Sequence, residues 1–139
     1  SSFVTWSTAN IASTPLDLFA EVCPGKEKVH WNKDYEEMET YVKKSGGTII
    51  ENKGATFFAV SMSVCHICKC ILNGSGTALT VSTMMHGEYG VDDVCLSTLA
   101  LVGSNGVHTK ITSPLTEEET AKMQRSAQTL REIIDGLEI

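Results

Sequence analysis

The densest group of reactive side chains in the sequence is three cysteines and a histidine within six residues. Cys65, Cys68 and Cys70 lie in the run Cys-His-Ile-Cys-Lys-Cys. Residues three apart share one face of a helix, so these thiolates could bind a soft metal ion. A closed metal site usually draws ligands from two segments, and no second Cys or His pair has a suitable spacing. We predict that the three small side chains pack in a helix surface and bind no metal. The alternative is a free-standing binding or metal-sensing module built on the cluster.

The four histidines are candidates for acid–base chemistry, because histidine titrates near neutral pH. None of them lies beside a recognisable nucleophile motif. One of them alternates with Val107 and Thr109 as a surface residue of a strand does. We assign no catalytic role to any of the four, which are His30, His66, His86 and His108.

Thr56 follows Lys53-Gly54-Ala55, a break before a long apolar segment. A hydroxyl and free backbone amides at a helix N-terminus form a natural site for a carboxylate or phosphate. Threonine is also a common N-cap without any further role. The residues alone favour the simple N-cap.

Long helices are expected to position these residues. We predict one helix over Trp31–Glu51, after a turn at Cys23-Pro24-Gly25-Lys26, and a second over Thr56–Asn73. Gly46-Gly47 lies in the later half of the first helix, where each glycine costs about 1 kcal/mol relative to alanine. Gly74-Ser75-Gly76 resembles the start of a dinucleotide fingerprint, but it follows a helix and precedes a strand. It is predicted to end the second helix.

A small antiparallel sheet and a last helix follow. We predict two or three strands, over Thr77–Met84, Val94–Val102 and Val107–Ile111, the last two joined by the hairpin turn Gly103-Ser104-Asn105-Gly106. The nearly continuous apolar run of the middle strand predicts burial on both faces. Thr116 to Glu119 is a capping box, and an apolar stripe follows it at helical spacing: Met123, Ala127, Leu130, Ile134 and Leu137. This order predicts an α+β fold, with a mostly antiparallel sheet packed by long helices.

The bulk composition narrows the functional classes. A chain of 139 residues has room for one domain, here residues 1–139. The net charge of -6 and the dispersed basic residues argue against a nucleic-acid partner.

The sequence also bears on the location of the protein. The apolar run 56–72 is short for a membrane span and predicts a buried helix, and we expect no signal peptide. An odd number of cysteines, five, favours a reducing cytoplasm. Because the chain does not begin with Met, we expect a processed protein or a piece of a longer one.

Several segments, taken in order, resemble the C-terminal domain of L-lactate dehydrogenases. Trp6-Ser7 and Asn10-Ile11-Ala12 resemble the beginning of that domain, and Lys53-Gly54-Ala55-Thr56-Phe57-Phe58 resembles its Lys-Gly-(Ala/Tyr)-Thr-aromatic segment. The other matching segments are Thr80-Val81-Ser82, Gly87-Glu88-Tyr89-Gly90, Gly103-Ser104-Asn105-Gly106-Val107 and the closing run from Leu115 to Leu130. The resemblance covers nearly the whole chain.

The resemblance implies reversible hydride transfer between NADH and a small 2-oxo acid such as pyruvate. In that family the catalytic histidine stands in a Gly-Glu-His-Gly-Asp box, directly before the segment that Ser1 to Val4 resembles. The Rossmann NAD-binding domain, the substrate-binding arginine and the aspartate that orients the histidine also lie upstream. We therefore assign no catalytic residue here and expect the isolated chain to be inactive.

The resemblance also implies roles for three residues. Thr56 matches a threonine that lines the substrate pocket, and Val60 matches an aliphatic residue that packs on the nicotinamide ring. Gly46, with Gly47, falls where the family often has Ala-Tyr beside the substrate side chain. We therefore expect tolerance of substrates bulkier than pyruvate, with malate as a further alternative. The expected partners are the nucleotide-binding domain and further copies in a homo-oligomer, with no membrane.

Overall fold

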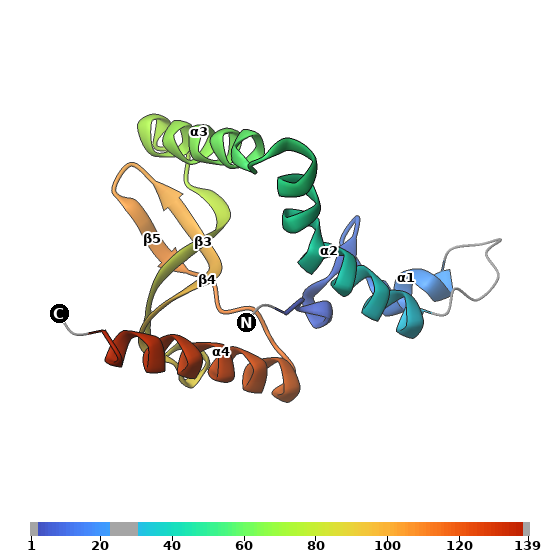
Figure 1. Ribbon diagram of the computed structural model, residues 1–139. Coiled ribbons are helices and arrows are strands. Elements are labelled where there is room, and N and C mark those ends of the chain that lie inside the picture. Colours follow the sequence, from blue (N-terminus) through green and yellow to red (C-terminus); the bar gives the residue numbers. More distant parts are fainter. Residues whose placement is uncertain (1–2, 23–30, 138–139) are drawn as a thin grey trace.

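The computed structural model describes residues 3–22 and 31–137 and shows long helices around a three-stranded sheet, with a second, two-stranded sheet near the N-terminus (Figure 1). The turn predicted at Cys23–Lys26 lies outside the described residues, as does His30. In chain order the elements are η1 (Trp6–Thr8), β1 (Asn10–Ile11), β2 (Thr14–Pro15), α1 (Leu16–Val22), α2 (Trp31–Lys53), α3 (Phe57–Asn73), β3 (Thr77–His86), η2 (Glu88–Gly90), β4 (Asp92–Gly103), β5 (Gly106–Lys110) and α4 (Glu117–Asp135).

The larger sheet is antiparallel with the strand order β3-β4-β5. β3 and β4 pair from Thr77 opposite Val102 to Met84 opposite Cys95, and an irregularity follows between Met84 and His86. The predicted hairpin is confirmed, since Gly103 pairs with Gly106 across a two-residue turn. Gly106 has φ +83°, a conformation that favours glycine. The α+β class predicted from the sequence is confirmed.

The expectation that the middle strand is buried on both faces is wrong for this chain. Along β4, Val94, Leu96 and Thr98 are buried, whereas Cys95 and Ser97 between them are exposed. Successive side chains of a strand point to opposite faces, so one face of β4 packs inside and the other is open. An apolar run shows that both faces of a strand could be buried, but it does not show whether another element packs on each face.

The core lies between α4 and the neighbouring end of the sheet. Its buried members are Met85, Val91, Val94, Leu96, Met123 and Ala127. The predicted capping box opens α4, because the Thr116 hydroxyl accepts from the backbone N–H of Glu119 at 3.2 Å. The predicted stripe is confirmed at its beginning, and Leu130 packs against the core. Ile134 and Leu137 are exposed, because the core ends before them.

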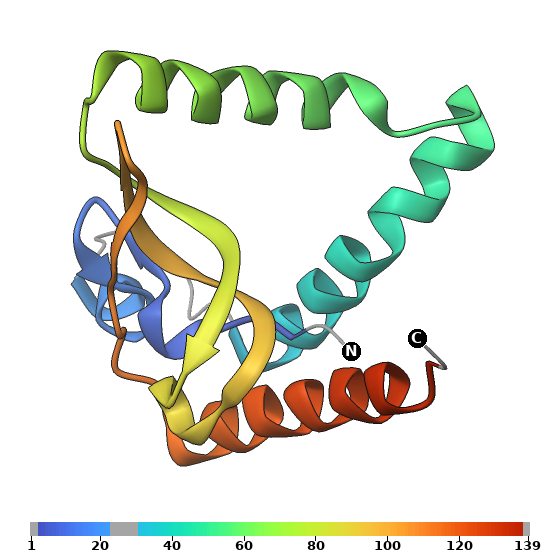
Figure 2. The same ribbon diagram turned by 90° about the vertical axis from the view of Figure 1, so that its left-hand side faces the viewer.

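α3 and α4 lie at opposite ends of the sheet, and α2 runs between them on the side away from the sheet (Figure 2). The axes of α2 and α3 turn by 117° at the short break between them. Cys70 is the buried residue of α3, so the expectation of a buried helix is wrong. Within the described residues no single helix is long and apolar enough to cross a membrane. The bent α2–α3 pair meets that criterion only when its helices are taken together.

Candidate functional site

The N-terminus of α3 is set by a glycine that ends α2. Gly54 has φ +78°, which favours glycine, and its backbone N–H donates to the Ile50 carbonyl at 2.7 Å. The chain turns sharply there and re-enters a helix at Phe57. The Phe57 and Phe58 rings lie 4.5 Å apart in the first turn. This corner therefore presents helix amides beside exposed apolar rings.

Thr56 occupies the N-cap position of α3, as the sequence predicts, but its side chain makes no capping hydrogen bond. Its backbone angles, φ -114° and ψ 40°, lie outside the extended region that N-cap residues usually adopt. The first backbone amides of the helix have no acceptor within the helix. The exposed hydroxyl and these amides can therefore both donate to a carboxylate or another anion.

Val60 lies one helical turn beyond Thr56, and residues four apart share one side of a helix. Its side chain is 58% exposed, so simple core packing is excluded as its role within this chain. The polar Thr56 and the apolar Val60 thus make up a two-part exposed flank at the start of α3. Such a flank can contact a ligand that has a charged end and an apolar surface.

Gly46 lies on α2, and the structure does not bring it against Thr56 or Val60. A Cβ atom at Gly46 or Gly47 would meet no atom within 4 Å. The residues alone do not explain why two glycines stand in the later half of this helix. No close packing within the described chain requires them.

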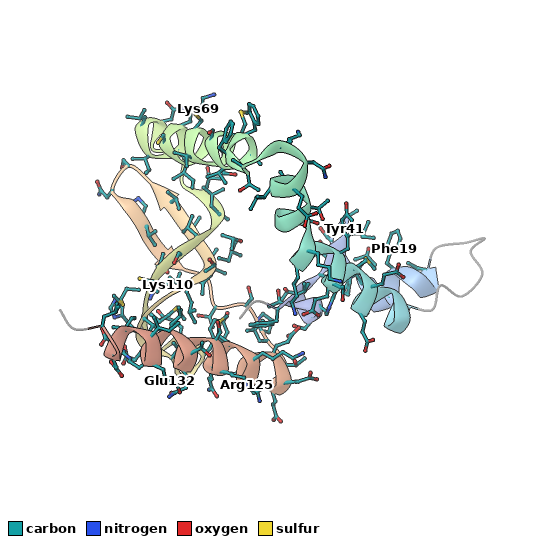
Figure 3. The ribbon with its side chains drawn as sticks, viewed as in Figure 1. Phe19, Tyr41, Lys69, Lys110, Arg125 and Glu132 are labelled. Carbon is teal, nitrogen blue, oxygen red and sulfur yellow. The ribbon has the colours of Figure 1, made fainter. Side chains whose placement is uncertain are left out.

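Apolar side chains are exposed along the length of α3. Phe57, Val64 and Leu72, at spacings of seven and eight residues, are 55%, 51% and 84% exposed. Tyr41 and Lys69, labelled in Figure 3, also project into solvent from α2 and α3. Exposed apolar side chains arranged along one helix side are typical of an interaction surface.

The N-terminal segment joins α2 to α4. Trp6 stacks on Tyr35 of α2 with the ring centroids 4.4 Å apart. Ser7 donates to the Glu119 carboxylate of α4 from its backbone N–H, at 3.0 Å, and from its hydroxyl. Thr116 donates its backbone N–H to the same carboxylate at 3.1 Å. Burial raises the pKa of Glu119, but the hydrogen bonds from Ser7 and Thr116 outweigh this and hold the pKa below its ordinary value.

Sequence reasoning missed this role of Glu119. The capping-box spacing predicts its local bond to Thr116, and the resemblance singles out Trp6-Ser7, but nothing in the sequence connects the two. Ser7 and Glu119 are separated by 112 positions, beyond the reach of any spacing rule.

The cysteine cluster does not form one site. Cys65 and Cys68 are exposed, whereas Cys70 is buried. The prediction that these side chains pack against neighbouring elements is confirmed for Cys70 and wrong for Cys65 and Cys68. Among the described residues there is no group of three or more His, Cys, Asp or Glu side chains that could hold a metal ion. The metal-sensing interpretation of the three cysteines is therefore not supported.

The three described histidines show no arrangement typical of nucleophile activation. His66 Nε2 lies 3.8 Å from Cys70 Sγ within α3. His86 is exposed at the end of β3. His108 is exposed on β5 as the sequence predicts, but its neighbours Val107 and Thr109 are exposed as well.

Comparisons with known proteins agree with the fold. Residues 1–138 match the family model of the lactate/malate dehydrogenase alpha/beta C-terminal domain. The chain is 41% identical over 135 residues to an L-lactate dehydrogenase of Acetivibrio thermocellus, covering 96% of this chain and 41% of that protein. It is 39% identical over 140 residues to an L-lactate dehydrogenase of Thermoanaerobacter pseudethanolicus, covering 100% and 44%. The chain spans about two fifths of the length of these relatives.

Solved structures give the same result. A lactate dehydrogenase from a Medee basin deep-sea metagenome library has a TM-score of 0.87 at 28% identity, covering 96% of this chain and 41% of that one. The minor L-lactate dehydrogenase from Enterococcus mundtii, in a ligands-bound form, has a TM-score of 0.87 at 29% identity, covering 97% and 42%. The chain therefore belongs to the lactate/malate dehydrogenase family, and residues 1–138 correspond to its alpha/beta C-terminal domain.

Proposed function

We propose that this chain is the substrate-binding part of an NAD-dependent L-lactate dehydrogenase, which interconverts pyruvate and L-lactate. The observation that carries the proposal is the exposed flank at the start of α3, where the Thr56 hydroxyl makes no capping bond. The names of the relatives support the same reaction. In this proposal the nucleotide-binding domain and the proton-transferring histidine belong to the part of the protein outside these residues.

Each residue of the flank has a distinct task in this proposal. The Thr56 hydroxyl donates a hydrogen bond to the 2-oxo acid, and the positive end of the α3 dipole favours the negative charge of the substrate. NAD supplies or accepts the hydride when bound. The exposed Val60 side chain offers its nicotinamide ring an apolar surface from which binding would displace water.

Thr56→Ala in the full-length enzyme tests this assignment. We expect the KM for pyruvate to rise about tenfold or more, because a hydrogen bond to a charged group contributes about 1.5–3 kcal/mol. Thr48→Ala is the matched control, since the Thr48 hydroxyl donates to the Lys44 carbonyl of its own helix. An unchanged KM in Thr56→Ala would refute the role of the hydroxyl.

Gly46 and Gly47 extend the proposal to the size of the substrate. If they border the substrate side chain, the open space around them accommodates 2-oxo acids bulkier than pyruvate. We expect kcat/KM for 2-oxobutyrate and 2-oxoisocaproate, relative to pyruvate, to fall in the double variant Gly46→Ala, Gly47→Tyr. Identical ratios in the two enzymes would show that these glycines do not set specificity.

The exposed apolar side chains of α3 support a role for the domain in contact with other protein surfaces. We infer that a nucleotide-binding domain and a second copy of the protein cover Phe57, Val64 and Leu72. The four described cysteines are free, and Cys65, Cys68 and Cys95 are exposed, which fits a reducing cytoplasm.

A further inference from the structure

Two of the cysteines form an exposed pair of thiols on α3. Cys65 and Cys68 are free and exposed, and they lie three residues apart within the continuous helix Phe57–Asn73. Residues three apart are neighbours on a helix surface, so the two thiols lie on one side of α3 within a single turn. Lys69, the residue after Cys68, projects from the same turn into solvent (Figure 3). The dehydrogenase reaction proposed for the chain uses neither thiol.

The helix holds these two thiols too far apart for a direct disulfide bond. Cβ atoms of residues three apart on a helix surface are separated by about 5–6 Å. A disulfide bond requires a Cβ–Cβ distance of about 3.5–4.5 Å, so it could form here only if part of α3 unwound. A bridge with one additional atom between the sulfurs spans a wider gap and leaves the helix intact. The pair therefore suits a ligand whose central atom bonds two sulfurs.

We propose that Cys65 and Cys68 together bind trivalent organoarsenic compounds. Thiolates are soft ligands, and trivalent arsenic is a soft centre that carries, beside its organic group, two hydroxyl groups that thiols can displace. Two As–S bonds form, two As–O and two S–H bonds break, and the hydroxyl groups leave as two molecules of water. Arsenic stays trivalent and the sulfurs keep their oxidation state, so the step needs no oxidant or reductant.

The other described cysteines do not offer an equivalent pair. Cys70 is two residues after Cys68, which places it on the opposite side of the helix, and it is only 4% exposed. Cys95 is exposed, but it lies on β4. The described part of the chain holds no group of three or more His, Cys, Asp or Glu side chains that could bind a metal ion, which agrees with a ligand that needs only two sulfurs.

The thiol pair lies beside exposed apolar residues of α3. Cys68 stands four residues after Val64 and four before Leu72, so it is their neighbour on the helix surface. Contacts with other protein surfaces are proposed above for these two residues. The thiols are therefore open in the separated chain, where an arsenical would bind in place of such a contact. The proposal concerns the thiols of α3 alone and does not depend on the dehydrogenase reaction.

Titration with phenylarsine oxide, in competition with a small dithiol, tests the site. In a background with Cys23 and Cys95 changed to Ser, we expect one arsenical per chain by native mass spectrometry. Adding Cys65→Ser leaves Cys68 and Cys70, which are closer in sequence but on opposite sides of the helix. This variant should bind at least about 100-fold more weakly, because the second As–S bond is no longer formed within one molecule. Cys70→Ala in the same background is the control and should leave the affinity unchanged.

Two further measurements, on variants whose circular dichroism matches the wild type, show whether the helix sets the affinity. Cys68→Ser combined with Lys69→Cys places the second thiol four residues after Cys65 and should restore tight binding. In concentrated urea, Cys65→Ser should bind as tightly as its background, because an unfolded chain no longer holds Cys68 and Cys70 apart. Equal affinity of these two proteins without urea, or weak binding after the Lys69→Cys change, would overturn the proposal.

Discussion

Glu119 connects the N-terminal segment to α4 through hydrogen bonds. Its carboxylate accepts hydrogen bonds from Ser7 and Thr116 while the residue is only 7% exposed. We expect Glu119→Ala to lower the free energy of unfolding by about 2–3 kcal/mol, because hydrogen bonds to a charged group are lost and the Ser7 donors are left unpaired. Urea denaturation followed by circular dichroism measures this change.

Glu118 provides the matched control for Glu119. It stands one position earlier on α4 and pairs with Lys122 at 2.8 Å, but its side chain is 79% exposed. Since exposed ion pairs contribute little, Glu118→Ala should change the free energy of unfolding by less than about 0.5 kcal/mol. Equal losses in the two alanine variants would contradict the special role of Glu119.

Glu88 should make the stability of the fold sensitive to acid. Its carboxylate pairs with Lys110 at 2.6 Å and accepts the His86 N–H at 2.6 Å, and these contacts lower the pKa of Glu88 to about 2. With the pKa lower in the folded state than the unfolded value of 4.5, the unfolded state binds more protons between these values. The stabilisation by Glu88 is therefore complete above pH 4.5 and is lost as pH falls toward 2.

Melting temperatures recorded from pH 6 down to pH 2 test the contribution of Glu88. The wild type should lose melting temperature below pH 4.5 more steeply than Glu88→Gln, which cannot ionise. Lys110→Met should flatten the profile in the same way, because it removes the main partner of the carboxylate. Parallel profiles for all three proteins would show that the ion pair contributes nothing to folding.

For single residues, the sequence predicts the position of a residue in its helix better than the contacts that its side chain makes. The position of Thr56 at the start of α3 follows from the glycine before it and the apolar run after it. The lack of a capping bond does not follow, because it depends on the backbone angles that the sharp turn imposes on Thr56. The three cysteines likewise differ in burial because only one side of α3 faces the sheet.

Among the helices, α2 is weakened by its own sequence. A Cβ atom at Gly46 or Gly47 would meet nothing within 4 Å, so alanine there should add helix propensity without a clash. We expect Gly46→Ala and Gly47→Ala each to stabilise α2 by about 1 kcal/mol, which slows exchange of its backbone amides about fivefold. Hydrogen exchange followed by mass spectrometry measures this locally.

Substitution of Gly54 by alanine should have the opposite effect on the rate of amide exchange. Its φ of +78° is unfavourable for alanine although the space around it is also open. Gly54→Ala should therefore speed amide exchange at the α2–α3 corner. If all three alanine variants shifted exchange in the same direction, the backbone argument would fail.

The sequence predicts which segments are helices and which are strands. It does not predict which of their faces are covered by other elements. β4 extends over Asp92–Gly103 where Val94–Val102 is expected, because pairing with β3 begins at Asp92 and pairing with β5 continues to Gly103. The turns are predicted well, since Gly74 and Gly106 adopt conformations that few other residues tolerate. Burial of the faces of β4 and α3 failed as a prediction, because periodicity cannot say which neighbour is present.

At the scale of the whole molecule, the exposed apolar residues of α3 should drive self-association. We expect the double variant Phe57→Ser, Val64→Ser to weaken association at least about tenfold, because apolar residues central to an interface dominate its energy. Ile133→Ser is the control, since Ile133 is similarly exposed, at 57%, but lies on α4. Sedimentation velocity over a range of concentrations measures the change. A wild type that stays monomeric throughout would contradict the prediction.

The way Ser7 meets Glu119 also has a kinetic consequence. The sheet and α4 are built from one continuous stretch, Thr77–Asp135, in which each strand pairs with its neighbour in sequence, as in the two-residue hairpin. Closing the Ser7–Glu119 contact instead requires two segments 112 positions apart to meet, which is slow and entropically costly. The stretch from β3 to α4 should therefore behave as one cooperative folding unit, to which α2 and the N-terminal segment attach last and from which they detach first.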